Sequence, residues 1–272
     1  MTRNRNHGSQ PQFTHGAALA LEHAAASHVG RRDNNEDAVC VAPEHGLFAV
    51  ADGMGGYAGG EVASAIVAHT LHSCFSRARA GAGTGTGTGT GTGAGGVVDA
   101  GDDSGAQLIT MAVRQAHDDV RARKVGALAE MGSTVAALVV RDGHAVIAHV
   151  GDSRVYRLRD GVLAQLTCDH SLAEEMRAAG GHVGDDFPYR NVITRAIGMR
   201  EGARVDVVVS SLEAGDVFLL CTDGLTEGLD DDELAALLTA PPATAAPALV
   251  RAAYDAGGRD NITAVVVRVR AV

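Results

Sequence analysis

Residues 46–61 read GLFAVADGMGGYAGGE. An apolar run typical of a buried strand ends at Asp52, and five of the next eight residues are glycines. Glycine at such a place lets another backbone segment or a ligand approach closely and permits positive φ angles. The stretch therefore predicts a central strand that carries a carboxylate to the edge of a sheet, beside a loop without bulky side chains.

Other carboxylates occupy similar places in the sequence. They lie at the ends of apolar runs, beside glycine, asparagine or serine, and are Glu36, Asp37, Asp152, Asp223 and Asp260. Several carboxylates that converge at the ends of central strands repel one another unless a cation is present. Oxygen ligands without histidine or cysteine favour Mg²⁺ or Mn²⁺, which also accept a backbone carbonyl such as that of Gly53.

Two further aspartates have a simpler interpretation. Asp142-Gly143 and Asp160-Gly161 separate short apolar runs, and Asp-Gly is typical of tight type I′ hairpin turns. Arg31 and Arg32 precede the acidic pair at 36–37. A guanidinium suits bidentate phosphate binding, although a solvated surface arginine remains an equal alternative. Without a Walker pattern, a nucleotide-binding P-loop is excluded.

Composition limits the class of protein. The 272 residues carry a formal net charge of −10, which argues against a nucleic-acid partner. The four cysteines form no CxxC pair, so we expect reduced thiols and a cytoplasmic location. No apolar run approaches the about 18 residues of a membrane span, and no heptad pattern requires an oligomer, so we expect a soluble monomer.

Hydrophobic periodicity predicts an α+β fold. Predicted strands cover 37–42, 46–51, 133–140, 144–150, 154–159, 162–167, 204–210, 216–222 and 261–270. Predicted helices cover 61–77, 106–124, 171–180, 231–239 and 245–256. In the second helix, Leu108, Ile109, Met111, Ala112, Gln115 and Ala116 fall near one side. Short connections between most strands indicate antiparallel sheets.

The chain is predicted to form one domain. Residues 1–20 are expected to be a flexible tail, and 21–272 a single folded domain. Residues 81–105 contain a low-complexity Gly/Thr tract, which is interpreted as a linker inserted between two helices.

Taken together, these motifs resemble the metal-dependent protein phosphatase (PPM) family, the type 2C Ser/Thr phosphatases, in its bacterial form. The matching motifs span nearly the whole chain and are GRRDNNEDAV (30–39), ADGMGGYAGGEVAS (51–64), GSTVAALVV (132–140), AHVGDSRVYRLRDG (148–161), DHSL (169–172), NVITRAIG (191–198), LLCTDGLTE (219–227) and GGRDNITAVVV (257–267). The resemblance implies a four-layer α-β-β-α sandwich of two antiparallel sheets, with metals at one edge between the sheets.

The resemblance also implies a role for each acidic residue. It assigns two central Mn²⁺ or Mg²⁺ ions to Asp52, the Gly53 carbonyl, Asp223, Asp260 and, directly or through water, Glu36. Asp52 is expected to bridge the two ions. Cys40, Cys74, Cys168 and Cys221 are not expected to act as nucleophiles, because the family forms no covalent intermediate.

The remaining assignments concern the surroundings of the two ions. The resemblance assigns a third, weaker ion to Asp152 with Glu227, and phosphate binding to Arg32. Asp37 and Asn261 are expected to support the ligands. Catalysis is expected to involve Arg32 with the three aspartates of the central pair of ions.

The implied reaction is hydrolysis of phosphoserine and phosphothreonine esters by a water that bridges the two ions. Phosphoproteins, and a bacterial Ser/Thr kinase that the enzyme opposes, are the implied partners. Two alternatives stay open: a regulator phosphatase acting on an anti-sigma antagonist, and a non-catalytic pseudophosphatase that serves as a binding module. Intact metal-binding motifs argue against the second alternative.

The sequence departs from its bacterial relatives at two places. Tyr57 occupies a position where many relatives have histidine, so the general acid stays unassigned. The resemblance implies a flap over residues 169–190. Its part after DHSL is short, polar and glycine-rich, and His182 within it is expected to be an exposed flap residue rather than a ligand.

Overall fold

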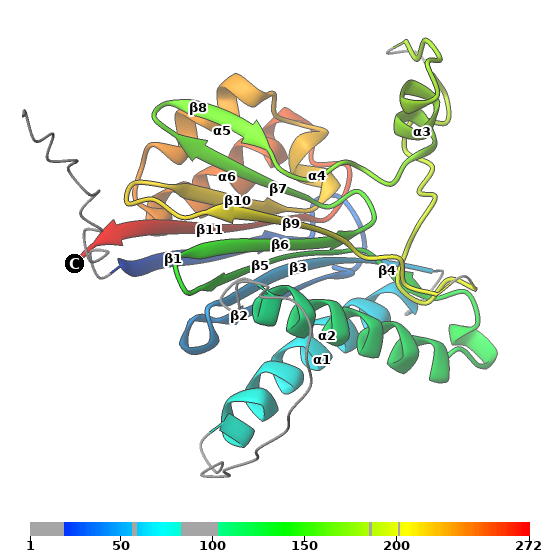
Figure 1. Ribbon diagram of the computed structural model, residues 1–272. Coiled ribbons are helices and arrows are strands. Elements are labelled where there is room, and N and C mark those ends of the chain that lie inside the picture. Colours follow the sequence, from blue (N-terminus) through cyan, green and yellow to red (C-terminus); the bar gives the residue numbers. More distant parts are fainter. Residues whose placement is uncertain (1–18, 56–58, 83–102, 185–186, 201) are drawn as a thin grey trace, which may run out of the picture.

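The computed structural model describes residues 19–55, 59–82, 103–184, 187–200 and 202–272. In this part of the chain two antiparallel sheets lie face to face between two layers of helices (Figure 1). The predicted α-β-β-α sandwich is therefore confirmed. The layers follow from the sequence. In the central strands, the residues that point to one face and those that point to the other are both apolar, so each face must be covered.

Sheet I combines the N-terminal strand with strands from the C-terminal half. Its order is β1 (Leu19–His28), β11 (Ile262–Ala271), β10 (Val217–Cys221), β7 (Arg154–Arg159) and β8 (Val162–Gln165). Helices α4 (Asp223–Thr226), α5 (Asp231–Leu238) and α6 (Pro242–Ala256) cover its outer face (Figure 1).

Sheet II contains the strand that ends in Asp52 and the glycine-rich stretch. Its order is β2 (Asp37–Ala42), β3 (Leu47–Met54), β5 (Val135–Arg141), β6 (His144–Val150) and β9 (Asp206–Ser211), and β4 (Gly132–Ser133) pairs with β3. Helices α1 (Gly59–Ala82) and α2 (Asp103–Ala122) cover its outer face (Figure 1). Short 3₁₀ turns are η1 (Pro43–His45) and η2 (Gly126–Leu128).

The core between the sheets contains large apolar side chains from both. Phe48 and Ile147 of sheet II are buried in one cluster with Phe218, Leu220 and Val265 of sheet I. Because this inner layer is apolar along the middle of the strands, polar groups can gather only at its ends.

Both predicted Asp-Gly turns are hairpins of the predicted kind. Asp142 (φ 50°) and Gly143 (φ 78°) join β5 to β6, and Asp160 (φ 51°) and Gly161 (φ 79°) join β7 to β8. Positive φ at both central residues defines the type I′ turn. These two aspartates serve the turns and lie away from the acidic cluster.

The predicted boundaries need correction at three places. Residues 19 and 20 belong to strand β1 and not to a flexible tail, whose other residues, 1–18, lie outside the described residues. Helix α1 continues to Ala82 and helix α2 begins at Asp103, so both ends of the 81–105 insertion are helical. The rest of the Gly/Thr tract, 83–102, is not among the described residues.

The segment predicted to be a flap carries α3 (Leu172–Ala178), which projects beyond the two sheets (Figure 1). Ser171 caps this helix by accepting a hydrogen bond from the Glu174 backbone N–H. His182 is exposed, as expected. Within the described ranges, the helices are too short or too polar to cross a bilayer.

Candidate active site

Four of the predicted site residues meet at one end of the sandwich, two from each sheet. Asp37 and Asp52 are directly paired across β2 and β3. Asp223 follows β10 and Asp260 precedes β11, and because these strands are antiparallel both residues lie at the same edge of sheet I. The carboxyl groups of Asp52 and Asp223 interact electrostatically across the two sheets, which joins the two pairs.

The glycines after Asp52 allow two backbone segments to touch. A Cβ on Gly53 would lie 2.0 Å from the Gly60 carbonyl oxygen, and a Cβ on Gly60 would lie 2.5 Å from Glu36 Oε2. The Gly53 N–H donates to the Glu36 carbonyl (3.1 Å), which also accepts from the Ser64 hydroxyl (2.5 Å). The first turn of α1 is thus packed directly against the strand end and against Glu36.

Hydroxyl groups join Asp52 to the loop that carries Asp152. The Asp52 N–H donates to Thr134 Oγ1 (2.9 Å), which lies 2.6 Å from Ser153 Oγ. The Thr134 hydroxyl thus contacts both the Asp52 backbone and the Ser153 side chain. Both hydroxyl residues are completely or almost completely buried, so the position of the Asp152 loop relative to β3 is fixed.

Burial and mutual repulsion raise the pKa of four aspartates. Burial, followed by the charges of neighbouring aspartates, raises the pKa of Asp152 to about 7 and that of Asp223 to about 6. The pKa of Asp37 rises to about 7, mainly through burial, against the opposing effect of threonine hydroxyls. Asp52 is raised well above its ordinary value by burial and by Asp223.

This chemistry fits divalent cations. Among the described residues, three buried carboxylate oxygens accept no hydrogen bond: Oδ1 of Asp37, of Asp152 and of Asp223. Buried polar atoms normally have partners, and a cation would satisfy these oxygens and relieve the repulsion. All the side-chain atoms that could bind a metal here are oxygens, the ligands that Mg²⁺ and Mn²⁺ prefer. In the described chain, the groups of three ligands whose atoms all lie within 4.8 Å of one another are found elsewhere.

Asp37 and Asn261 support this arrangement through hydrogen bonds. The Thr222 hydroxyl donates to Asp37 Oδ2 (2.9 Å). The Asn261 amide donates to the carbonyls of Val29 and Asn34 (both 2.9 Å), and its oxygen accepts from the Glu36 N–H (2.8 Å). One buried amide therefore fixes both ends of the loop between β1 and β2.

Arg32 lies on that loop. Its Nη2 is 2.7 Å from Asp260 Oδ2, and its Nε donates to the Arg259 carbonyl (3.2 Å). The Arg32 side chain is 57% exposed, so its guanidinium reaches solvent beside the acidic cluster. Asp260 Oδ1 accepts from the Asn261 N–H (2.8 Å), and each oxygen retains a second lone pair for a cation.

The charges of Asp152 and Glu227 both act on Asp223 or are affected by it, and the Glu227 N–H donates to the Asp223 carbonyl (2.8 Å). Glu227 is exposed and accepts a hydrogen bond from the Asn191 amide (2.9 Å), which ties α4 to the end of the flap segment. A cavity of 380 Å³ opens beside them, lined among others by Asn191, Gly224, Glu227, Gly258 and Arg259.

Sequence reasoning did not identify two buried histidines next to Asp152 as parts of the site. His170 Nδ1 accepts from the Gly151 N–H (3.1 Å), so its Nε2 carries the proton and donates to Asp206 (3.1 Å). His149 stacks on it with ring centroids 4.6 Å apart and donates from Nε2 to the Cys168 carbonyl (2.9 Å). His170 thus anchors the backbone next to Asp152 to the start of the flap segment.

Two further predictions concern residues that take no part in this geometry. Burial raises the pKa of Cys40 to about 11 and that of Cys221 to about 12, and a thiol with such a pKa is a poor nucleophile at neutral pH. Tyr57, where the general acid was left unassigned, lies outside the described residues.

Comparison with known proteins identifies a family. The profile of protein phosphatase 2C matches residues 24–249. The serine/threonine protein phosphatase PstP of Mycobacterium tuberculosis is 33% identical over 260 residues, which cover 91% of this chain and 45% of that protein. The serine/threonine phosphatase stp of Listeria monocytogenes is 31% identical over 233 residues, covering 81% and 83% respectively.

Solved structures agree with this likeness. The catalytic domain of PstP in complex with two manganese ions superimposes with a TM-score of 0.76 at 32% identity, over 93% of this chain and 100% of that one. The chain spans about half the length of the full PstP protein, 45% of it. From the matched profile and these relatives, the chain belongs to the protein phosphatase 2C family.

Proposed function

We propose that this protein is a metal-dependent protein serine/threonine phosphatase. The observation that carries the proposal is the cluster of buried aspartates from both sheets, with raised pKa values and buried oxygens that accept no hydrogen bond. Relatives named as serine/threonine phosphatases, one of them solved with two manganese ions, support this reading of the cluster.

Two Mn²⁺ or Mg²⁺ ions would be held by Asp52, Gly53, Asp223 and Asp260, with Glu36 at their side. When bound, they would supply Lewis-acid chemistry, which lowers the pKa of an attacking water and offsets charge on the phosphoryl group. A third ion would be held by Asp152 and Glu227, whose charges both interact with that of Asp223.

The chain's own part in the reaction is orientation. The Arg32 guanidinium, fixed by Asp260 and by the Arg259 carbonyl, would bind the phosphoryl oxygens at the mouth of the cluster. Asn261 would fix the positions of Arg32 and Glu36 relative to each other, because it is hydrogen-bonded to both ends of their loop. The 380 Å³ cavity beside Glu227 offers room for substrate residues that flank the phosphorylated side chain.

The same proposal includes the domain organisation, the partners and the cellular location. The predicted catalytic domain, 21–272, would extend to include residues 19 and 20 of β1, with 169–190 as a flap over the cavity. Phosphorylated proteins, including a Ser/Thr kinase and its substrates, would be the partners, and the four free cysteines agree with a cytoplasmic protein that works as a monomer in signalling.

Peptides that differ only in the phosphorylated residue test the substrate class. With Mn²⁺ present, we expect phosphate release from phosphothreonine and phosphoserine peptides and little from the phosphotyrosine peptide. Turnover confined to an anti-sigma antagonist would favour a regulator phosphatase instead. Absence of turnover in folded protein would favour a binding module.

A further inference from the structure

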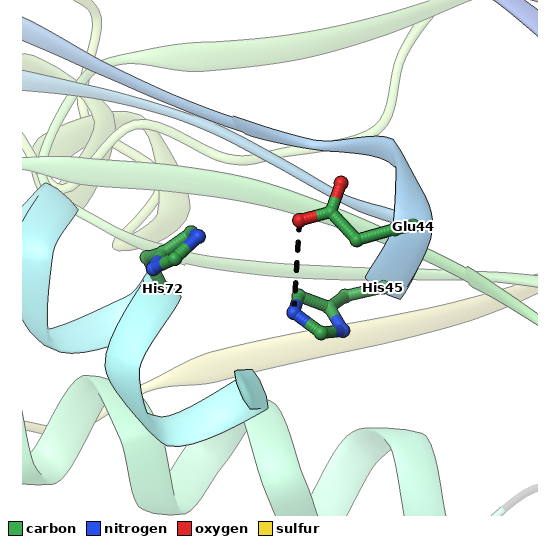
Figure 2. A group of neighbouring side chains, drawn as sticks. All are labelled: Glu44, His45 and His72. Atoms are coloured by element: carbon green, nitrogen blue, oxygen red, sulfur yellow. Dashed lines mark ion pairs between the residues drawn. The ribbon is translucent and has the colours of Figure 1, made fainter. Parts of the chain in front are cut away.

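A second group of metal-ligating side chains lies at the other end of sheet II. Glu44 and His45, from the turn η1, face His72 of helix α1 (Figure 2). One ligand atom from each residue lies within 4.8 Å of the other two, and His45 Nε2 is 3.7 Å from Glu44 Oε1. We name these three residues the turn–helix triad.

The backbone on both sides of the triad is held firmly. Pro43 begins the turn, and the Gly46 N–H closes it on the Pro43 carbonyl (3.0 Å). Arg79 of α1 donates to the Glu44 carbonyl (2.6 Å), which ties the turn to the helix. Because two rigid elements present the ligands, little conformational entropy would be lost on chelation.

The side chains are also partly oriented for binding. The His45 side chain is only 10% exposed, and its Nε2 lies 3.1 Å from the Ser76 hydroxyl, one turn after His72 on the same face of α1. His72 and Glu44 are exposed, which leaves an entry path and room for water ligands. Ligands around tetrahedral Zn²⁺ are about 3.4 Å apart, so adjustments of about 1 Å would close the triad on an ion.

Two imidazoles and a carboxylate form a donor set unlike that of the acidic cluster. Nitrogen-rich sites favour late first-row cations, Zn²⁺ above all, whereas Mg²⁺ prefers oxygen ligands. We propose that the turn–helix triad is a peripheral binding site for Zn²⁺, independent of the phosphatase reaction. The β2–β3 ladder separates Ala42 from Asp37 by five residues, which corresponds to about 17 Å, so the site stands apart from the acidic cluster.

The other histidine group of the described chain does not offer the same chemistry. In the His149, His170 and Asp206 group, the Gly151 N–H occupies His170 Nδ1, so the proton sits on the Nε2 that faces Asp206. Arg195 also donates to Asp206 there. A cation would have to displace both a proton and a guanidinium.

Zinc titration by calorimetry tests the proposal, in millimolar Mg²⁺ that occupies the oxygen-rich cluster. We expect the wild-type protein to bind one more Zn²⁺ than His72→Ala or His45→Ala. His69→Ala is the matched control, since His69 is also exposed on α1 but is outside the triad, and it should titrate like wild type. Zn²⁺ should also raise the melting temperature of wild type more than that of His72→Ala.

An equal number of zinc sites of equal affinity in wild type and in either triad variant would overturn the proposal. Because the measurement reads binding and stability in the presence of Mg²⁺, it does not depend on turnover. The proposed phosphatase activity could therefore be disproved while the zinc site is confirmed, and the zinc site could be disproved while the activity is confirmed.

Discussion

Asp223 is the residue on which the acidic cluster depends most. It interacts with Asp52 across the two sheets and with Asp260 and Glu227 on its own side, and its Oδ1 accepts no hydrogen bond among the described residues. Asp223→Asn removes a charge from the centre of the proposed two-ion site. We expect Mn²⁺-dependent turnover to fall by more than about a hundredfold, beyond what loss of a supporting residue costs.

Asp142→Asn is the matched control for this change. Asp142 has a positive φ of 50° in a hairpin turn, a conformation that asparagine adopts readily. It should keep wild-type turnover and Mn²⁺ affinity. Wild-type turnover by Asp223→Asn, measured side by side, would contradict the assignment.

Among single residues, the sequence predicts the acidic cluster and its support by Asp37 and Asn261, but not the hydroxyl groups around it. Carboxylates at the ends of apolar strands are unusual enough to be noticed. Thr222 donates to the Asp37 carboxylate, and the Thr134 and Ser153 hydroxyls join the Asp52 backbone to the loop of Asp152. Single hydroxyl residues beside strand ends are common, however, and carry no signal of their own. Only the paired register of distant strands shows which backbone or side chain they meet.

Among the elements, the start of α1 has the tightest contact with the site. A Cβ on Gly60 would meet Glu36 Oε2 at 2.5 Å and the Gly53 carbonyl carbon at 2.7 Å. Gly60→Ala should therefore displace the helix start, Glu36 or β3. We expect destabilisation of about 1–3 kcal/mol, as for overpacked sites, and at least about tenfold weaker Mn²⁺ binding by calorimetry.

Gly105→Ala in α2 is the control for this element. Its Cβ would meet Val146 Cγ2 at 3.5 Å, an ordinary contact, and alanine favours the helix. This variant should have unchanged Mn²⁺ affinity and equal or greater stability. If Gly60→Ala bound Mn²⁺ like Gly105→Ala, the close approach of α1 would not matter for the site.

Element prediction succeeds where periodicity is strong and fails where tertiary pairing decides. Strand β1 is rich in alanine, which carries no strand propensity, and it forms because ten residues pair with β11. Met111, predicted on the apolar side of α2, is 63% exposed, while Val113 and Val120 are buried. The sequence pattern alone does not define which face of a helix meets the sheet, so the predicted buried residues can be displaced by one position.

On the scale of the whole molecule, the acidic cluster affects stability. Folded Asp37 and Asp152 have pKa values of about 7, above the about 3.9 of an unfolded aspartate. The folded state therefore binds more protons, and its stability falls as pH rises through about 7. We expect chelated protein to melt several degrees lower at about pH 8 than at about pH 6.5.

Two comparisons check this sign. Mn²⁺ at about pH 8 should raise the melting temperature again, because it binds the ionised carboxylates of the folded protein. Below about pH 6.5 the trend should weaken, since burial lowers the pKa of His117 and His170, whose protonation favours unfolding. Chelated protein that became more stable from about pH 6.5 to about pH 8 would contradict the raised pKa values.

The central claim is that the two sheets assemble a cation-dependent phosphatase site, and metal removal and return tests it most directly. Hydrolysis of one phosphothreonine peptide would be measured in chelator and then after adding Mn²⁺ or Mg²⁺. We expect turnover to disappear with chelator and to return with either ion. Turnover that persists in chelator, or folded protein that stays inactive with both ions, would contradict it.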